Sequence, residues 1–311
     1  MLSQFGNGLA TGTLLSGMKL SSAIRNVMFG VAGAALNGCA LTHSPVLFPS
    51  GPVGMDERNL MFAAIGLMLI VIVPVWIMVL WFAIRYRASN GRARYAPNWS
   101  YSGRIDLVIW LVPGLIVTAL GYLIWTRTPR LDPYAQTAAG QGAPLTVQVV
   151  AEDWKWLFIY PQQDIASVNE LVIPVGRPVR LQLTSDTVMN AFYVPGLAGQ
   201  IYAMAGMRSS LNLRASKPAQ LTGRNMQYSG YGFAAQRFAV KAVSRDAFDA
   251  WVATARNAPK TLNAATYADF SRPSANVPVT YYYGIEPGLF AKIVAKNAPA
   301  AMKRASAAES Q

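Results

Sequence analysis

Residues 60–84 read LMFAAIGLMLIVIVPVWIMVLWFAI, a run of 25 residues without a charged side chain. At 1.5 Å per residue, a helix of this length extends roughly 37 Å, which crosses a bilayer core of about 30 Å with some tilt. Residues 107–126 form a second apolar run. Pro74 and Pro113 interrupt the hydrogen bonding of these helices, and a packed partner helix can cover the freed carbonyls. The sequence therefore predicts a transmembrane hairpin, helix 1 over 60–84 and helix 2 over 107–126, with two buried helices of a soluble protein as the alternative.

The connection between the two runs, residues 85–106, is strongly basic. It contains five arginines and no acidic residue before Asp106. Short loops rich in arginine face the cytoplasm by the positive-inside rule. The residues just before the first run, Asp56, Glu57 and Arg58, carry a net charge of −1. Both ends of the hairpin are therefore predicted on the outer side of the membrane, together with the N-terminus and the C-terminal domain.

Composition narrows the chemistry available to the chain. Of its 311 residues, 53% are hydrophobic and 13% charged, and the net charge is +13. The basic excess is not clustered as it is in nucleic-acid-binding proteins, so we expect no nucleic-acid partner. One Cys and one His exclude an intrachain disulfide, Cys/His zinc sites, iron–sulfur clusters, His-ligated haem and a Ser-His-Asp triad.

The N-terminal region resembles an export signal that begins inside the printed sequence. Met18 and Lys19 offer a basic start, and residues 27–36 are apolar. The following Leu36-Asn37-Gly38-Cys39 resembles a bacterial lipobox, in which cleavage precedes a Cys that becomes lipidated. We predict a signal peptide over 1–38, lipidation at Cys39 and an exported linker over 39–59. The alternative is an ordinary small-residue cleavage site with an incidental Cys.

The periodicity changes after Arg127. Apolar residues alternate with polar ones in runs beginning at Leu145, Val179 and Leu211, and Phe238 begins a further strand-like run. Glycine and proline separate these runs, a pattern typical of an antiparallel β-sandwich. We therefore predict an all-β exported domain over residues 127–243.

The remaining residues, 244–296, are predicted to form a C-terminal helical extension. Residues 246–256 place Phe248, Trp251 and Val252 on one helix face, with Ser244 or Asp246 as the cap. Further short helices are expected over 266–270 and 287–296. Residues 297–311 are rich in Ala, Ser and Lys and are predicted to be disordered.

Several residues admit two interpretations from the sequence alone. Asp106 is either an acid that suits the first turn of a helix or a proton-accepting carboxylate at the mouth of a conduit. Glu152, Asp153 and Glu170 form either a surface acidic patch or bonds to a partner. The methionines at 204, 207 and 226 suggest packing more than copper binding, and we expect no metal on this chain.

Between Gly51 and about Phe290 the chain contains a series of short motifs that occur in the same order in a known protein family. They include Gly66-Leu-Met-Leu-Ile-Val, Pro97-Asn-Trp-Ser, Asp153-Trp-Lys-Trp, Phe158-Ile-Tyr-Pro, Val188-Met-Asn190, Gln200-Ile-Tyr-Ala-Met-Ala-Gly-Met207 and Tyr228-Ser-Gly. This order resembles subunit II of haem–copper respiratory oxidases, and closely that of bacterial cytochrome bo-type ubiquinol oxidases. The resemblance implies a cupredoxin-like sandwich and a proton-pumping quinol oxidase subunit that binds no cofactor itself.

In such a complex, subunit I is expected to hold haem b, haem o or a related haem, copper and the ubiquinol site. The implied partners are oxidase subunits I, III and IV, membrane lipid, and ubiquinol through subunit I; a menaquinol-using relative is also possible. A stand-alone membrane lipoprotein or binding module with a copper-free cupredoxin-like domain is the alternative function.

The resemblance also allows individual positions of this chain to be compared with those of the copper-bearing relatives, the cytochrome c oxidases. Their binuclear copper centre needs thiolate and imidazole ligands. Asn190 stands where those relatives hold the first His, and their Cys-containing loop falls around 228–238, where this chain has no Cys or His. Trp154, Trp156 and Tyr160 lie where the relatives dock cytochrome c; we predict core packing of this strand, with a subunit interface as the alternative role. Asp106 aligns near the entrance of a proton pathway, where relatives have Glu.

Overall fold

The computed structural model describes residues 44–91, 98, 100–134 and 143–298. The predicted signal peptide, Cys39 and residues 299–311 lie outside the described residues. The chain divides into two compact units, Met1–Phe48 and Pro49–Gln311, and every element below belongs to the second.

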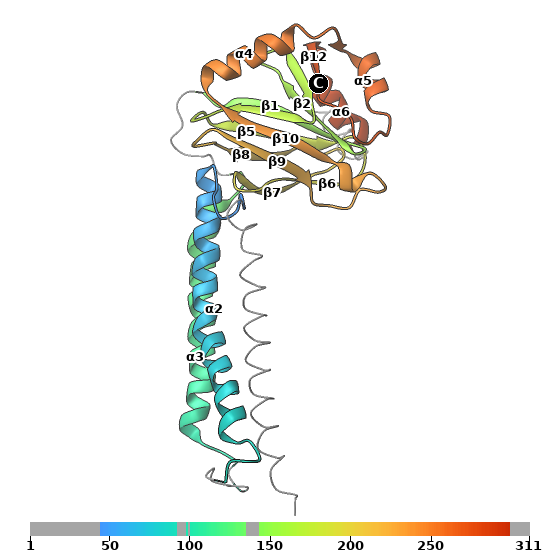
Figure 1. Cartoon of the computed structure of the whole chain (residues 1–311). Helices are drawn as coiled ribbons and strands as arrows, with labels where there is room; N and C mark the ends of the chain where they lie inside the picture. The colour runs from blue at the N-terminus through green and yellow to red at the C-terminus, as the bar shows by residue number, and fades with distance from the viewer. Residues whose placement is uncertain (1–43, 92–97, 99, 135–142, 299–311) are drawn as a thin grey trace, which may run out of the picture. The chain divides into compact units, whose positions relative to one another are not determined.

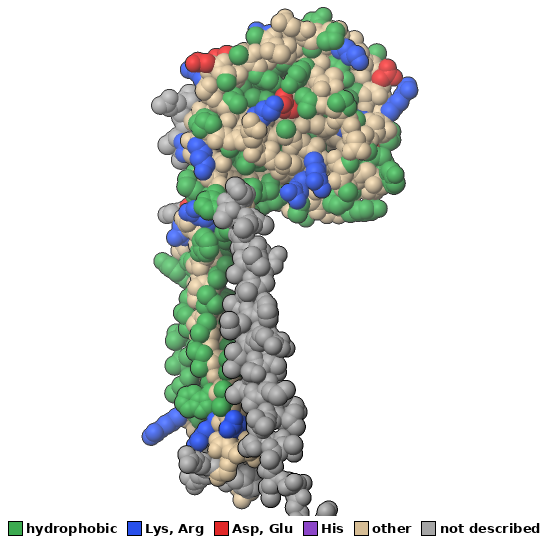
Figure 2. Space-filling model, in the orientation of Figure 1, with side chains coloured by type: hydrophobic (Ala, Val, Ile, Leu, Met, Phe, Trp, Pro, Cys, Tyr) green, Lys and Arg blue, Asp and Glu red, His purple; other side chains and the backbone are tan. Residues whose placement is uncertain are grey.

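Two long helices form the predicted hairpin. Helix α2 spans Pro52–Arg85 and α3 spans Gly103–Leu131, so each extends past its predicted apolar run by several residues. Pro52 stands in the first turn of α2, where a proline costs no hydrogen bond. The two helices contact each other. Figure 2 shows apolar side chains along their surface and basic side chains gathered at the loop end, the pattern expected of membrane-spanning helices.

The predicted sandwich is confirmed and consists of two facing sheets (Figure 1). The first has the order β11-β12-β3-β2-β1-β5-β8 and the second the order β4-β10-β9-β6-β7. The strands are β1 Leu145–Glu152, β2 Lys155–Tyr160, β3 Ile165–Val168, β4 Glu170–Pro174, β5 Val179–Ser185, β6 Asn190–Val194, β7 Ala198–Ala203, β8 Ser209–Leu213, β9 Ala219–Asn225, β10 Arg237–Val243, β11 Thr261–Leu262 and β12 Thr280–Ile285.

The core lies between the two sheets. Alternate residues of β1 and β5, including Val147, Leu181 and Leu183, face Phe192, Phe238 and Val240 of the other sheet. This alternation is the one visible in the sequence, because successive side chains of a strand point to opposite faces. Burying these apolar surfaces stabilises the domain by roughly 25 cal/mol per Å² removed from water.

The strand pairing differs from the antiparallel prediction. Strand β1 pairs with β5 in parallel, Leu145 opposite Val179, and β4 pairs with β10 in parallel, Leu171 opposite Val240. The other pairs of the two sheets, apart from β11 with β12, are antiparallel. After β3 the chain crosses to the second sheet as β4 and returns as β5, and such a crossing allows β5 to run in the same direction as β1.

The C-terminal segment is less helical than predicted. Helices α4 Arg245–Arg256, α5 Ala264–Phe270 and α6 Leu289–Asn297 are present, and the Ser244 hydroxyl caps α4 by accepting the Ala247 amide. However, β12 also extends the first sheet by pairing with β3. The short, aromatic stretch around Tyr282 is typical of a strand.

This segment covers the outer face of the first sheet. Leu157, Ile159 and Val168 point away from the central core and pack against Tyr267 of α5 and Phe290 of α6. Strand β2 is consequently buried on both faces, with all six residues inaccessible. The end of the sandwich where β1 turns into β2 is thus enclosed by the C-terminal segment.

Candidate functional site

Five neutral polar side chains meet at one end of the sandwich. Asn190 begins β6, Asn225 ends β9, Ser185 ends β5, and Ser229 and Gln236 belong to the loop between β9 and β10. Asn190, Asn225, Gln236 and Ser185 are buried and Ser229 is half-buried. We call these five residues the amide cluster. Asn190 stands at the position where the family resemblance places a lost copper-binding His, and Ser229 and Gln236 lie in the region where it places the lost Cys-containing loop.

The amide cluster is a closed hydrogen-bond network. Asn225 Nδ2 donates to Asn190 Oδ1 at 2.6 Å, to Gln236 Oε1 at 2.9 Å and to Ser229 Oγ at 3.2 Å. Gln236 Nε2 donates to Asn190 Oδ1 at 3.1 Å and to the Glu152 carbonyl at 3.2 Å. Asn190 Nδ2 donates to the Val188 carbonyl and to Ser185 Oγ, and the Ser229 hydroxyl donates to Gln236 Oε1. Each amide in the cluster therefore has partners for both its oxygen and its nitrogen.

The side chains of the amide cluster can neither carry an electron nor exchange a proton near neutral pH. The amides and hydroxyls are neutral at physiological pH, and their lone pairs are already used. Copper of the binuclear type requires soft thiolate and imidazole ligands, which the cluster lacks. Among the residues the structure describes, no group of three or more His, Cys, Asp or Glu side chains is placed to hold a metal ion.

A second cluster of charged groups lies beside the amide cluster. Glu152, the last residue of β1, has its Oε1 2.5 Å from the Tyr267 hydroxyl oxygen, and the same oxygen lies 3.1 Å from Asp186 Oδ2. Lys296 of α6 forms an ion pair with Asp186 at 2.8 Å. Burial raises the pKa of Glu152 to about 8; the Tyr267 hydrogen bond opposes this rise and the charge of Asp186 adds to it.

The three acidic residues singled out in the sequence do not form a surface patch. Glu152 and Glu170 are buried, and Asp153 is half-buried. Glu170 accepts hydrogen bonds from Tyr281 at 2.6 Å and from the Trp251 indole at 3.2 Å, and it pairs with Lys241 at 2.6 Å. Both glutamates stabilise contacts between the sandwich and the C-terminal segment of the same chain.

The aromatic residues of β2 are core residues. Trp156 and Tyr160 are completely buried, packed against Phe192 and Trp251 respectively, so this chain offers neither side chain on its surface to a partner subunit. Strand β2 faces inward because sheets and helices cover both its faces. The alternative prediction, that these rings pack a strand, is confirmed for Trp156 and Tyr160.

Trp154 differs from its neighbours because it lies in the turn between β1 and β2. Its backbone is left-handed, with φ of 67°, and its indole N–H donates to the Ser229 carbonyl at 3.0 Å. A Cβ at Gly232 would lie 2.3 Å from the indole, so only glycine fits there. Trp154 thus fixes the β9–β10 loop, which carries two members of the amide cluster.

Asp106 lies in the first turn of α3, with its side chain exposed and its backbone N–H donating to the Ser102 carbonyl at 3.0 Å. This position suits an acidic residue, because the helix dipole favours negative charge at the N-terminus. The geometry is compatible with both interpretations of Asp106.

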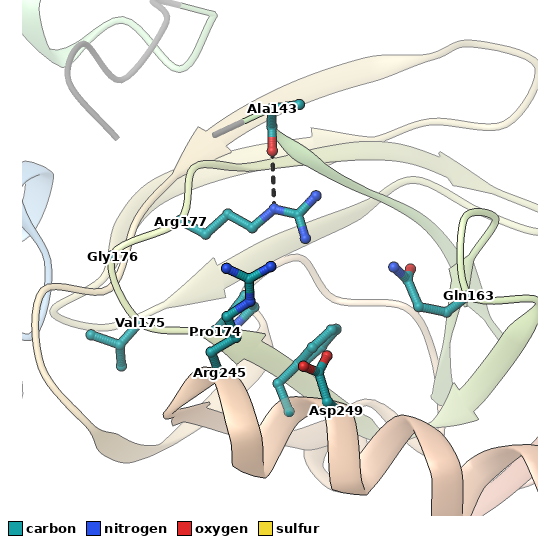
Figure 3. A pocket seen from close by; sticks show the side chains of 9 residues that line it. Ala143, Gln163, Pro174, Val175, Gly176, Arg177, Arg245 and Asp249 are labelled. Carbon is teal, nitrogen blue, oxygen red and sulfur yellow. Dashed lines mark hydrogen bonds between the residues drawn. The ribbon is translucent and has the colours of Figure 1, made fainter. Parts of the chain in front are cut away.

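A cavity of about 320 Å³ separates the β4–β5 turn from α4 (Figure 3). The guanidinium groups of Arg177 and Arg245 point into it together with the Gln163 amide, and Asp249 supplies an opposite charge. Arg177 Nε donates to the Ala143 carbonyl at 2.9 Å. The lining contains no nucleophile beside a base, so we assign it no chemistry.

Sequence inspection identified Asn190 but missed Asn225, Gln236 and Tyr267. No motif marks these three residues, and each has a partner that is far away along the chain: Asn225 and Asn190 are 35 positions apart, Gln236 and Asn190 are 46 apart, and Tyr267 and Glu152 are 115 apart. The one available signal was the presence of amides in a region where copper-bearing relatives have ligands.

Comparison with known proteins gives consistent matches. Residues 256–299 match the family model described as the COX Aromatic Rich Motif. The chain is 48% identical over 261 residues to cytochrome bo(3) ubiquinol oxidase subunit 2 of Pseudomonas aeruginosa, covering 84% of this chain and 78% of that protein. It is 46% identical to ubiquinol oxidase subunit 2 of Acetobacter aceti, covering 84% of each chain. It is also 36% identical to quinol oxidase subunit 2 of Bacillus subtilis, covering 76% and 74% respectively.

Among solved structures, the periplasmic domain of subunit II of the cytochrome oxidase of Bradyrhizobium japonicum is 27% identical to this chain. The match has a TM-score of 0.35 and covers 36% of this chain and 94% of that one.

Proposed function

The chain belongs to the family of subunit II of cytochrome bo(3)-type ubiquinol oxidases of the respiratory chain, and from this premise we propose that it is a non-catalytic partner of the haem–copper subunit I. Electrons pass from ubiquinol to dioxygen within subunit I, which holds haem b, haem o or a related haem, and copper. This chain contributes its hairpin within the inner membrane and its sandwich on the periplasmic side. Subunits III and IV complete the assembly.

The amide cluster is the observation that carries this proposal. An electron entering through the sandwich would need a metal centre there, and the buried amides are bonded to one another instead. Opening the network to admit a copper ion would leave buried amide groups without partners, at about 1–3 kcal/mol each. The geometry therefore supports a sandwich that serves structure rather than electron transfer.

The surface around the amide cluster supports a docking role. Loops after β5, β7 and β9 present exposed apolar side chains, which we call the apolar rim: Val188, Met189, Met207, Met226, Tyr228 and Tyr231. These loops are joined near the cluster, since the Met226 amide donates to the Ala191 carbonyl and Ser185 pairs with Ala205. Grouped apolar side chains on a surface are typical of a protein–protein contact. We propose that the apolar rim contacts subunit I.

The hairpin supports the same role. Trp76, Trp81, Trp110 and Trp125 are all exposed on α2 and α3 in the isolated chain. Lipid can cover such residues, and so can the helices of a partner subunit. We propose that one side of the hairpin packs on subunit I and places Asp106 near the cytoplasmic entrance of its proton pathway.

A pull-down combined with metal analysis tests the proposal. An affinity tag on the full chain should recover a haem-bearing polypeptide and ubiquinol oxidase activity from detergent-solubilised membranes. The separated full chain, incubated with copper and dialysed, should retain no copper, and a chelator should leave its melting temperature unchanged. A mixed-valence copper signal in electron paramagnetic resonance, or recovery of the chain without any haem protein, would contradict it.

A further inference from the structure

The hydroxyl of Tyr267 lies between two buried carboxyl groups. Its oxygen is 2.5 Å from Glu152 Oε1 and 3.1 Å from Asp186 Oδ2. Glu152 is 1% exposed, and Asp186 and Tyr267 are each 7% exposed. A phenol carries one proton, so it can donate to only one of the two carboxyl groups at a time. If both acids were ionised, one of these two short contacts would join oxygens with no proton between them.

The two acids differ in the hydrogen-bond donors around them. Asp186 accepts the Lys296 ammonium at 2.8 Å on Oδ2 and the Asn297 amide at 2.9 Å on Oδ1. Glu152 has no such partners, because its Oε2 is buried without a hydrogen bond. Lys155 is the other cation near Glu152, and its ammonium is already bonded to the Arg272 carbonyl and the Ser274 hydroxyl, both at 2.6 Å.

We propose that Glu152 carries a proton at neutral pH and that this proton latches the C-terminal segment onto the sandwich. The Glu152 carboxylic acid donates to the Tyr267 oxygen, and the Tyr267 hydroxyl donates to ionised Asp186. Each contact then holds one proton, and the cluster of Asp186 and Lys296 is neutral overall. Above neutral pH, Glu152 releases its proton to solvent and a second negative charge appears beside Asp186.

The latch joins elements that have few other polar ties. Tyr267 belongs to α5, Lys296 and Asn297 end α6, and Glu152 and Asp186 belong to the sandwich. Loss of the Glu152 proton therefore weakens the attachment of both helices at the same point. Burial raises the pKa of Glu152 to about 8, and the charge of Asp186 contributes to this rise, whereas Lys155 and Lys296 oppose it. In an opened state, with Glu152 in water, its pKa returns to about 4.5.

Hydrogen exchange on the full chain in detergent tests the latch. Between these two pKa values the closed form holds one proton more than the opened form, so the opening equilibrium rises about tenfold per pH unit. Protection of α5 and α6, corrected for the intrinsic exchange rate, should therefore fall about 50-fold from about pH 6 to about pH 8 and level off about one pH unit higher. The central strands provide an internal reference and should not follow this slope.

Two matched variants separate the latch from general burial of an acid. In Glu152→Gln the amide nitrogen can donate to Tyr267 without titrating, so the pH slope in α5 and α6 should disappear. Glu170→Gln is the control, because Glu170 is also a buried acid but is paired with Lys241. In this variant the pH slope should remain. A flat profile in the unaltered chain, or the same slope in Glu152→Gln, would overturn the proposal.

Infrared spectroscopy gives a second measurement that does not depend on a variant's stability. The full chain at neutral pH should show the C=O stretch of a buried carboxylic acid, which is lost as the pH is raised through about 8 and returns on acidification. Absence of this band at neutral pH in the unaltered chain would refute the protonated state of Glu152 directly.

Discussion

Replacing Asn225 by leucine, a side chain of similar size, tests how much the amide cluster contributes to stability. Asn225 is 4% exposed and joins three partners through Nδ2. Its Oδ1 accepts the backbone amides of Ala191 at 2.8 Å and Gln227 at 3.0 Å. The substitution removes all five hydrogen bonds without changing the volume of the site greatly.

The expected loss follows from what remains bonded. Asn190 Oδ1 keeps Gln236 Nε2, and Gln236 Oε1 keeps the Ser229 hydroxyl, so neither oxygen becomes unpaired. The Ala191 amide, however, is left buried without a partner, which costs about 1–3 kcal/mol. Two further costs come from the half-buried Gln227 amide, which loses its acceptor, and from the lost Nδ2 bonds. After subtracting the gain from burying leucine, they lower the free energy of unfolding by about 1 kcal/mol more. We expect the free energy of unfolding to fall by about 2–4 kcal/mol.

Urea denaturation of the full chain in detergent, followed by near-UV circular dichroism, measures this loss. Asn212→Leu is the matched control, because Asn212 makes an exposed hydrogen bond to the Tyr134 carbonyl at 3.1 Å and should change stability by less than about 0.5 kcal/mol. A loss below about 1 kcal/mol for Asn225→Leu, equal to that of the control, would refute the view that the closed network replaces a metal in holding this end of the sandwich.

Three further results are expected. In the assembled oxidase, Asp106→Asn should keep normal haem content but slow quinol oxidation several-fold, while Asp106→Glu should be tolerated; normal turnover of the Asn variant would leave Asp106 as a helix-start acid. Cys39→Ser should block processing but leave assembly largely intact, and mass spectrometry of the mature chain should find Cys39 acylated; an unmodified Cys39 would reject lipidation. Because its pKa is higher in the folded chain than in water, Glu152 should stabilise the fold fully below about pH 4.5 and lose that contribution by about pH 8, at about 1.4 kcal/mol per pH unit; urea denaturation across this range should show a steeper fall for the unaltered chain than for Glu152→Gln.

The limits of sequence inspection are clearest at strand β2. The sequence analysis predicts that the aromatic residues of this strand pack in a core, and Trp156 and Tyr160 both lie in the core between the sheets. Whether that face meets solvent, a partner subunit or the domain's own core depends on which layers cover the strand. The covering residues come from β10, α4 and the C-terminal segment, far away in the sequence, so the interface assignment could not be tested before the fold was known.

The amino-acid sequence by itself determined the two long apolar helices of the hairpin, and it shows that residues 127–311 contain none of the Cys and His ligands of a binuclear copper centre. These depend on run length and on the number of Cys and His residues, both of which are local or compositional properties. Only the tertiary structure decided that β1 and β5 run parallel, that Asn190, Asn225 and Gln236 close into one network, and that Tyr267 bridges Glu152 and Asp186. The physical reason is that periodicity reports which face a side chain points to, whereas its partner depends on how distant strands and helices are brought together.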